Sequence, residues 1–147
     1  MAVNTPRLQG ISAEAGTKYK FPDFEIGSMS VRGTLALVSI DKYEPIRSAK
    51  RLVLVFAPNA LSSNMEFAEA EMLKLLNPGG GPALLQAGKF QIRLRNRNAS
   101  RLKLYPLDLA GNRLKQLAPI KTDGDHALFS VDTARDGAAV FFELTTE

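Results

Sequence analysis

The single histidine, His126, is the first side chain that could do acid–base or nucleophilic chemistry. Asp125 precedes it and Ser130 follows it, so the residue types of a Ser-His-Asp triad are present. A triad requires the three groups to converge in space, whereas these should lie along a turn and the strand after it. One histidine without cysteine also supplies too few ligands for a transition-metal site. We therefore expect no catalytic residue, no metal and no cofactor.

Three glutamates, Glu66, Glu69 and Glu71, could suggest the carboxylate pair of a glycosidase. Such a pair faces across a cleft at about 5 to 9.5 Å, with its members usually on separate elements. These glutamates instead share one short segment that is predicted to be helical, where acidic residues near the N-terminus form a solvated face. They predict a helix surface rather than a catalytic pair.

Two further segments match ligand-binding loops only in part. Residues 77–82 (NPGGGP) lack the Lys-Ser/Thr pair of a P-loop, and they should follow a helix and precede a strand, the reverse of a phosphate cradle. Asp123 and Asp125 flank Gly124 but fall far short of the ligand series of an EF-hand. We interpret the first segment as a helix stop or loop and the second as a turn, with an incidental calcium ion left open.

A run of basic residues is the main candidate for binding. Its members are predicted to share the outward face of one hairpin: Arg93, Arg95, Arg97, Arg101, Lys103 and Tyr105. Such a face could contact phosphates or acidic sugars. Exposed strands are also routinely basic, because charge blocks edge-to-edge aggregation, so both interpretations stay open. Nucleic acid is the less favoured partner, since only one tyrosine interleaves with the cations to stack on bases.

The composition indicates one globular domain. A chain of 147 residues can bury a sizeable core, and 45% apolar with 23% charged residues argues against disorder. A formal net charge of +4 does not by itself name a partner. No apolar run reaches the roughly 18 residues of a membrane helix. We expect a single domain over residues 1–147, with residues 1–22 as a linker or the first edge strand.

Several segments have the periodicity of strands. Residues 34–40 (TLALVSI) and 51–57 (RLVLVFA) are apolar at odd and even positions, which predicts central strands covered on both faces. Residues 89–97 (KFQIRLRNR) alternate with period two, as half-buried strands do. A break at 98–100 and renewed alternation over 101–105 predict that these two segments form a hairpin.

Further strands are expected at 126–131 and 138–144, behind turns that contain Asp-Gly, with weaker candidates at 17–21, 24–26, 83–87 and 117–121. Five phenylalanines are expected in the core: Phe56, Phe90, Phe129, Phe141 and Phe142.

One helix is expected at residues 65–76. Asn64 could cap it, and Phe67, Leu73 and Leu76 recur at helical spacing before the segment 77–82 stops it. Short strands at roughly 8–12-residue spacing otherwise dominate. The predicted fold class is all-β, an antiparallel β-sandwich of about eight to ten strands with this one short helix.

Short groups of residues recur in a familiar order between Phe24 and Leu144. They are Ser39-Ile40-Asp41, Pro45-Ile46, Ser48, Arg51-Leu52-Val53-Leu54, Asn64-Met65, Gly81-Pro82-Ala83-Leu84-Leu85 and Leu107-Asp108-Leu109-Ala110-Gly111-Asn112-Arg113. This order resembles the C-terminal β-sandwich that follows the catalytic barrel in bacterial glycoside hydrolases of the TIM-barrel clan. The chain departs from the usual Asn-Thr-Gly-Met element, where it has Ser62-Ser63-Asn64-Met65.

In such enzymes the sandwich is non-catalytic, and the catalytic glutamates belong to the barrel. The resemblance therefore implies an accessory domain of a secreted or periplasmic carbohydrate-active enzyme, with its signal outside this chain. The implied partners are the N-terminal catalytic TIM-barrel domain of the same polypeptide and, through it, polysaccharide, with no membrane partner. Two other functions stay open. One is a carbohydrate-binding module with an acidic-glycan site on the 93–105 face; the other is a stand-alone module that binds a polyanion or a protein.

Overall fold

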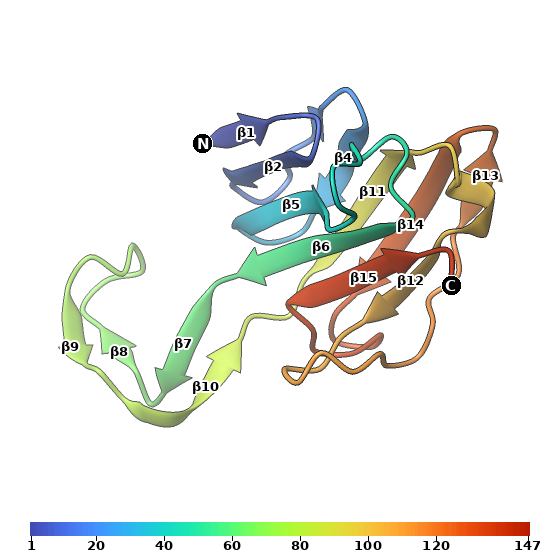
Figure 1. Cartoon of the computed structure of the whole chain (residues 1–147). Helices are drawn as coiled ribbons and strands as arrows, with labels where there is room; N and C mark the ends of the chain where they lie inside the picture. Colours follow the sequence, from blue (N-terminus) through green and yellow to red (C-terminus); the bar gives the residue numbers. More distant parts are fainter.

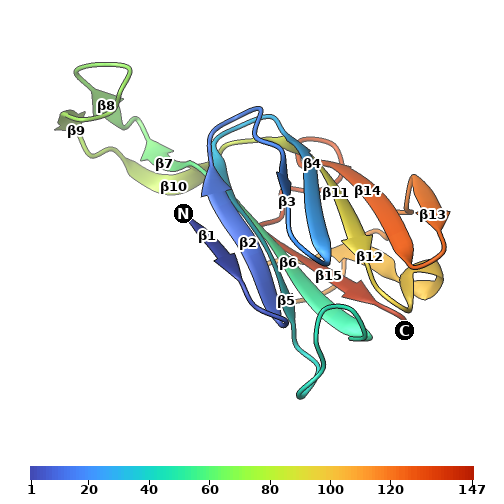
Figure 2. The same ribbon diagram turned by 90° about the horizontal axis from the view of Figure 1, so that it is seen from above.

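Two antiparallel sheets packed face to face form the body of the molecule, and a long arm leaves it at one side (Figure 1). The computed structural model describes residues 1–147 and contains strands and one 3-10 turn, η1 (Ala99–Arg101). The view from above separates the two layers (Figure 2). The predicted all-β antiparallel sandwich is confirmed.

The larger sheet has six strands in the order β1-β2-β5-β6-β15-β12. Their bounds are β1 (Ala2–Asn4), β2 (Leu8–Ala13), β5 (Gly33–Ser39), β6 (Arg51–Pro58), β15 (Phe141–Thr145) and β12 (Lys103–Pro106). The second sheet has five strands in the order β13-β14-β11-β4-β3. Their bounds are β13 (Lys121–Asp123), β14 (His126–Asp132), β11 (Lys89–Arg95), β4 (Phe24–Met29) and β3 (Tyr19–Lys20).

Aromatic side chains hold the two sheets together. The ring of Phe90 on β11 lies 4.8 Å from that of Phe56 on β6, and it meets Phe142 on β15 edge-on at 5.5 Å between centroids. These contacts lie within one cluster of 23 buried apolar residues that joins both sheets. Phe129 is also buried as expected, but the prediction for Phe141 is wrong, because its side chain points outward and is 42% exposed.

The two segments with apolar residues at both parities, β5 and β6, are inner strands of the six-stranded sheet, as predicted. Their inward residues, such as Leu35 and Leu54, are completely buried. The expectation that both faces are covered is wrong, because no second layer lies over the outward face and its residues are half-buried.

The predicted hairpin between residues 89–97 and 101–105 is also wrong. β11 pairs with β14 and β4 in one sheet, and β12 pairs with β15 in the other. Asn96 directs this crossing: it is fully buried, and its amide donates to the carbonyls of Ile46 and Ala49 at 2.6 and 2.9 Å. The chain then turns through η1 and enters the opposite layer.

The helix expected at residues 65–76 does not form. The segment instead contains β8 (Glu66–Phe67), an exposed tip and β9 (Leu75–Asn77). Asn64 has φ of 61°, whereas an N-cap residue is extended. An isolated helix of this length is marginal in water, and no neighbouring layer lies against its apolar stripe. The flanking strands pair with each other, which favours a hairpin between them.

The remaining candidates fall close to observed strands. Residues 1–22, expected to be a linker or the first edge strand, contribute the edge strands β1 and β3 and the second strand β2. The weak candidate at 117–121 contains only the first residue of β13, and Leu117 makes an isolated bridge with Leu104.

Candidate interaction surface

The arm spans residues 59–86 and is built from two short antiparallel ribbons. β7 (Ala60–Ser63) pairs with β10 (Gly80–Leu85), and β8 pairs with β9 closer to the tip. Both views show it projecting away from the sandwich (Figures 1 and 2). None of its residues belongs to the buried core. Two-stranded ribbons are marginally stable in water, and the arm adds no residue of its own to the buried core.

Apolar side chains on the arm face solvent. Six of the fifteen exposed large apolar residues lie on it: Met72, Leu73, Leu75, Leu76, Leu84 and Leu85. Leu73 at the tip is 84% exposed. Exposed apolar clusters of this kind mark interaction sites in soluble proteins. The glutamates once considered as a catalytic pair, Glu66, Glu69 and Glu71, are exposed on the same arm and form no ion pair.

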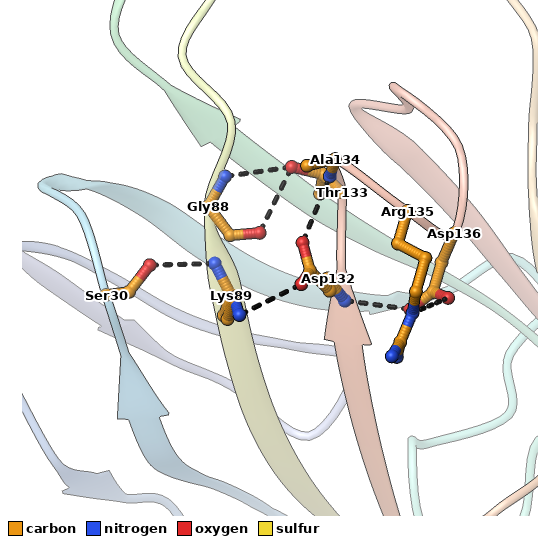
Figure 3. Close-up of polar contacts among 8 residues, drawn as sticks. All are labelled: Ser30, Gly88, Lys89, Asp132, Thr133, Ala134, Arg135 and Asp136. Atoms are coloured by element: carbon orange, nitrogen blue, oxygen red, sulfur yellow. Dashed lines mark hydrogen bonds and ion pairs between the residues drawn. The ribbon is translucent and has the colours of Figure 1, made fainter.

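Where the arm returns to the sandwich, a polar network holds the chain (Figure 3). Gly88 donates from its N–H to Thr133 Oγ1 at 2.9 Å, and its carbonyl accepts from Thr133 Oγ1 at 3.1 Å. Lys89 pairs with Asp132 at 3.1 Å, and this hydrogen bond lowers the pKa of the Asp132 carboxyl. A Cβ on Gly88 would come within 2.8 Å of the Phe56 ring. The root of the arm is therefore packed closely against the core.

The outward face of the six-stranded sheet carries an apolar strip. Cross-strand register aligns Ala36 with Val55 and Phe141, and Val38 with Val53 beside them. We call these five residues the valine strip. Each is half-buried or exposed, although β-branched and aromatic residues on a sheet face normally pack against a second layer. The strip therefore resembles a surface that a partner covers.

The valine strip continues into a hollow beneath the arm. Ser12, Thr34 and Ala57 extend the same outward face, and together with Glu71 and Met72 of the arm tip they line a cavity of about 640 Å³. Strip, hollow and arm therefore form one continuous surface, which we call the arm-side surface.

An ion cluster borders the valine strip at the β12 side. Glu143 is buried and accepts from Arg113 Nε at 2.6 Å and from Arg51 Nε. The hydrogen bond from Arg113, followed by that from Arg51, lowers the pKa of Glu143 against the opposing effect of burial. The Arg113 guanidinium also lies 5.2 Å from the centre of the Tyr105 ring. This cluster makes a charged rim beside the apolar strip.

The six residues predicted to form one basic face are distributed over three places. Arg93 and Arg95 lie on β11, in the five-stranded sheet. Arg97 and Arg101 lie in the connection between the sheets. Lys103 and Tyr105 lie on β12, on the outward face of the other sheet. The prediction of a single continuous face is wrong because the expected hairpin does not form. Arg93 and Arg95 still share one sheet face, beside Leu128 and His126 of β14.

The structure does not bring a triad together. His126 Nδ1 lies 2.8 Å from Asp125 Oδ1, but Ser130 is four residues along the same strand, about 13 Å away at roughly 3.3 Å per residue. Asp125 also accepts from Arg95 Nε at 2.8 Å, and this bond lowers the pKa of the Asp125 carboxyl. No group of three or more His, Asp or Glu side chains is placed to hold a metal ion.

Residues that carry the resemblance have structural roles. The Asp41 carboxylate accepts from the N–H groups of Lys50 and Arg51 at the start of β6. Ile46 is fully buried. The Asp108 carboxylate accepts from the side chain and N–H of Asn112, which lowers its pKa and closes the turn. Asp41 and Asp108 therefore order loops, and Ile46 packs in the core.

Comparison of the chain with protein-family models, with curated proteins and with solved structures returned no match. Within the structure, no helix has the length and apolar character needed to cross a bilayer.

Sequence reasoning missed the leucines of the arm and the outward side chain of Phe141. Leu73 and Leu76 were predicted to lie on a helix face, and Leu84 and Leu85 in a weak strand candidate. The only signal in the sequence was the apolar content of β5 and β6 at both parities, which pointed to apolar residues on both faces of these strands.

Proposed function

We propose that the chain is a non-catalytic accessory domain of a secreted carbohydrate-active enzyme and that it packs on the catalytic barrel of the same polypeptide. The observation that carries the proposal is the arm-side surface: an apolar strip, a hollow and an apolar arm that are continuous and uncovered. The ordered resemblance to the sandwich domains of TIM-barrel-clan glycoside hydrolases supports the choice of partner.

The geometry suits a fixed interdomain contact. Domains move relative to one another by default unless the interface is large and hydrophobic. The valine strip supplies an apolar centre and the Glu143 cluster supplies a polar rim, which is the usual anatomy of a protein interface. The arm adds apolar contacts at a distance from the strip. A partner held at both places would be fixed in orientation.

The first test is to sequence the source gene upstream of the codon for Ala2. A reading frame that continues for several hundred codons with alternating strand and helix patterns supports the proposal. A stop codon directly before Met1 removes its basis. The isolated chain is expected to hydrolyse no glycan, and hydrolysis by the pure chain would also contradict the proposal.

The second test uses the parent polypeptide. Val55→Lys combined with Phe141→Lys places two charges on the valine strip, and we expect calorimetry to resolve two unfolding transitions where the unmodified protein has a shared one. Ser130→Lys, on the outward face of the opposite sheet, is the matched control and should leave the shared transition intact. In the isolated chain, the double variant should change stability by only about 1 kcal/mol, because both positions point outward. Unchanged cooperativity in the double variant would rule out packing through the strip.

A further inference from the structure

The outward face of the five-stranded sheet carries a small cavity that is separate from the arm-side surface. Its volume is about 270 Å³, and its lining residues come from three adjacent strands: Arg93, Lys121, Asp123, His126 and Leu128. Register places Lys121 opposite Leu128, and Leu128 opposite Arg93. Two cations therefore flank one leucine in a single cross-strand row, and Asp123 and His126 form the next row.

Some charged groups in and beside this cavity form ion pairs, and others do not. Arg95 and His126 both contact the Asp125 carboxylate at 2.8 Å. Arg93 and Lys121 are exposed, and neither has a carboxylate within ion-pairing distance. The Nδ1 atom of His126 is engaged by Asp125, which leaves Nε2 for another partner. The cavity thus presents two cations that form no ion pair, beside the Asp123 carboxylate and one imidazole nitrogen. Glu25 lies opposite Arg93 on the neighbouring strand β4 but is not within ion-pairing distance of it.

We propose that this cavity binds a negatively charged sugar unit, with the carboxylate of a uronate held between Arg93 and Lys121. Leu128 provides an apolar floor for the C–H face of the ring, and Asp123 accepts hydrogen bonds from hydroxyl groups. The volume is below the roughly 300 Å³ at which sites for drug-sized ligands begin, so it suits one ring rather than a larger molecule. The preference for an anion rests on this geometry, and the choice of a sugar rests on the proposed function.

Phosphate on a nucleic acid is the competing ligand for the same cations. Binding of single strands relies on aromatic side chains that stack on successive bases. The cavity contains no aromatic ring except the imidazole of His126, which is held by Asp125. The lining therefore favours a sugar carboxylate over a base-stacked strand.

The test titrates the full chain, labelled with ¹⁵N, with trigalacturonate and with neutral galactotriose at about 50 mM salt. We expect shifts in β11, β13 and β14 with the charged trimer only. Arg93→Ala combined with Lys121→Ala should weaken binding about tenfold or more, because charge-assisted hydrogen bonds are lost. Arg101→Ala is the matched control: this exposed cation lies on η1, outside the cavity, and its loss should leave affinity unchanged.

Absence of shifts, equal binding of the neutral trimer, or full affinity in the double variant would overturn the inference. Tighter binding of an oligothymidylate through the same residues would overturn it in favour of phosphate. This test can fail without the proposed function failing, and the reverse also holds. Lys substitutions on the valine strip should leave uronate binding intact, and the Arg93/Lys121 variant should leave interdomain cooperativity intact.

Discussion

Replacing residues 60–85 by an Asn-Gly turn should leave the sandwich folded and at least as stable as the full chain. The two ends already meet in hairpin geometry, because Gln86 donates its N–H to the carbonyl of Asn59 at 2.9 Å. Asn-Gly is the favoured two-residue turn between such antiparallel ends. The replacement therefore removes the arm without changing the strand ends that it joins.

The expected change in stability follows from what the arm contributes to the fold. None of the 23 core residues lies in the arm, so no apolar burial in the core is lost. Shortening the connection to two residues lowers the entropy cost of loop closure by roughly 2 kcal/mol. At about 2–4 °C per kcal/mol for a chain of this size, Tm should be unchanged or rise by up to about 8 °C.

Calorimetry and urea unfolding followed by circular dichroism would measure this change. Leu54→Ala in the full chain is the sensitivity control, because Leu54 is fully buried and its truncation should cost about 2–5 kcal/mol. A fall in Tm of more than about 5 °C in the armless variant would refute the reasoning, since it would mean that the arm stabilises the sandwich. In the parent polypeptide, the same replacement should separate the unfolding transitions.

Two further predictions concern buried polar groups. Glu143→Gln should lower stability at neutral pH by about 2–3 kcal/mol, because the hydrogen bonds from Arg51 and Arg113 lose their charged acceptor. The loss is no larger because both arginines are partly hydrated. Because the pKa of Glu143 is lowered in the folded state, its contribution to the free energy of unfolding is complete above the ordinary pKa of 4.5 and is lost as pH falls through the folded-state pKa. The urea unfolding curves of variant and unmodified protein should therefore converge in acid. A difference in stability that does not change with pH would contradict the assignment. Asn96→Ala should lower the free energy of unfolding in urea by about 2–4 kcal/mol, because the buried carbonyls of Ile46 and Ala49 lose their donor. Arg97→Ala, at the exposed neighbouring position, is the control and should change it by no more than about 0.5 kcal/mol. Equal effects of the two substitutions would show that Asn96 does not stabilise the crossing between the sheets.

The strands with clear local patterns could be predicted from the sequence. Alternation over residues 89–95 placed Phe90 and its inward neighbours in the core, and apolar content at both parities placed β5 and β6 at the centre of a sheet. These predictions succeed because the direction of a strand side chain depends only on its position along the strand.

Pairing could not be predicted in the same way. The segments at 89–97 and 101–105 are neighbours in sequence with matching alternation, yet a buried Asn96 sends them to different sheets. The apolar spacing of residues 65–76 fits a helix, but no layer lies against that stripe and β7 pairs with β10 around it. Both errors have the same cause. The structure of each segment depends on residues that are distant in sequence, and a local pattern does not contain them.

The sequence by itself therefore determined the all-β class of the fold and the core face of strands with clear alternation, such as residues 89–95. Only the tertiary structure decided which residues share a surface. It separated the basic run, placed Phe141 beside Val55, and brought Lys121 across Leu128 to Arg93. The physical reason is that a surface is assembled by strand order and register, and these are set by the free energy of the whole packed sandwich rather than by any single segment.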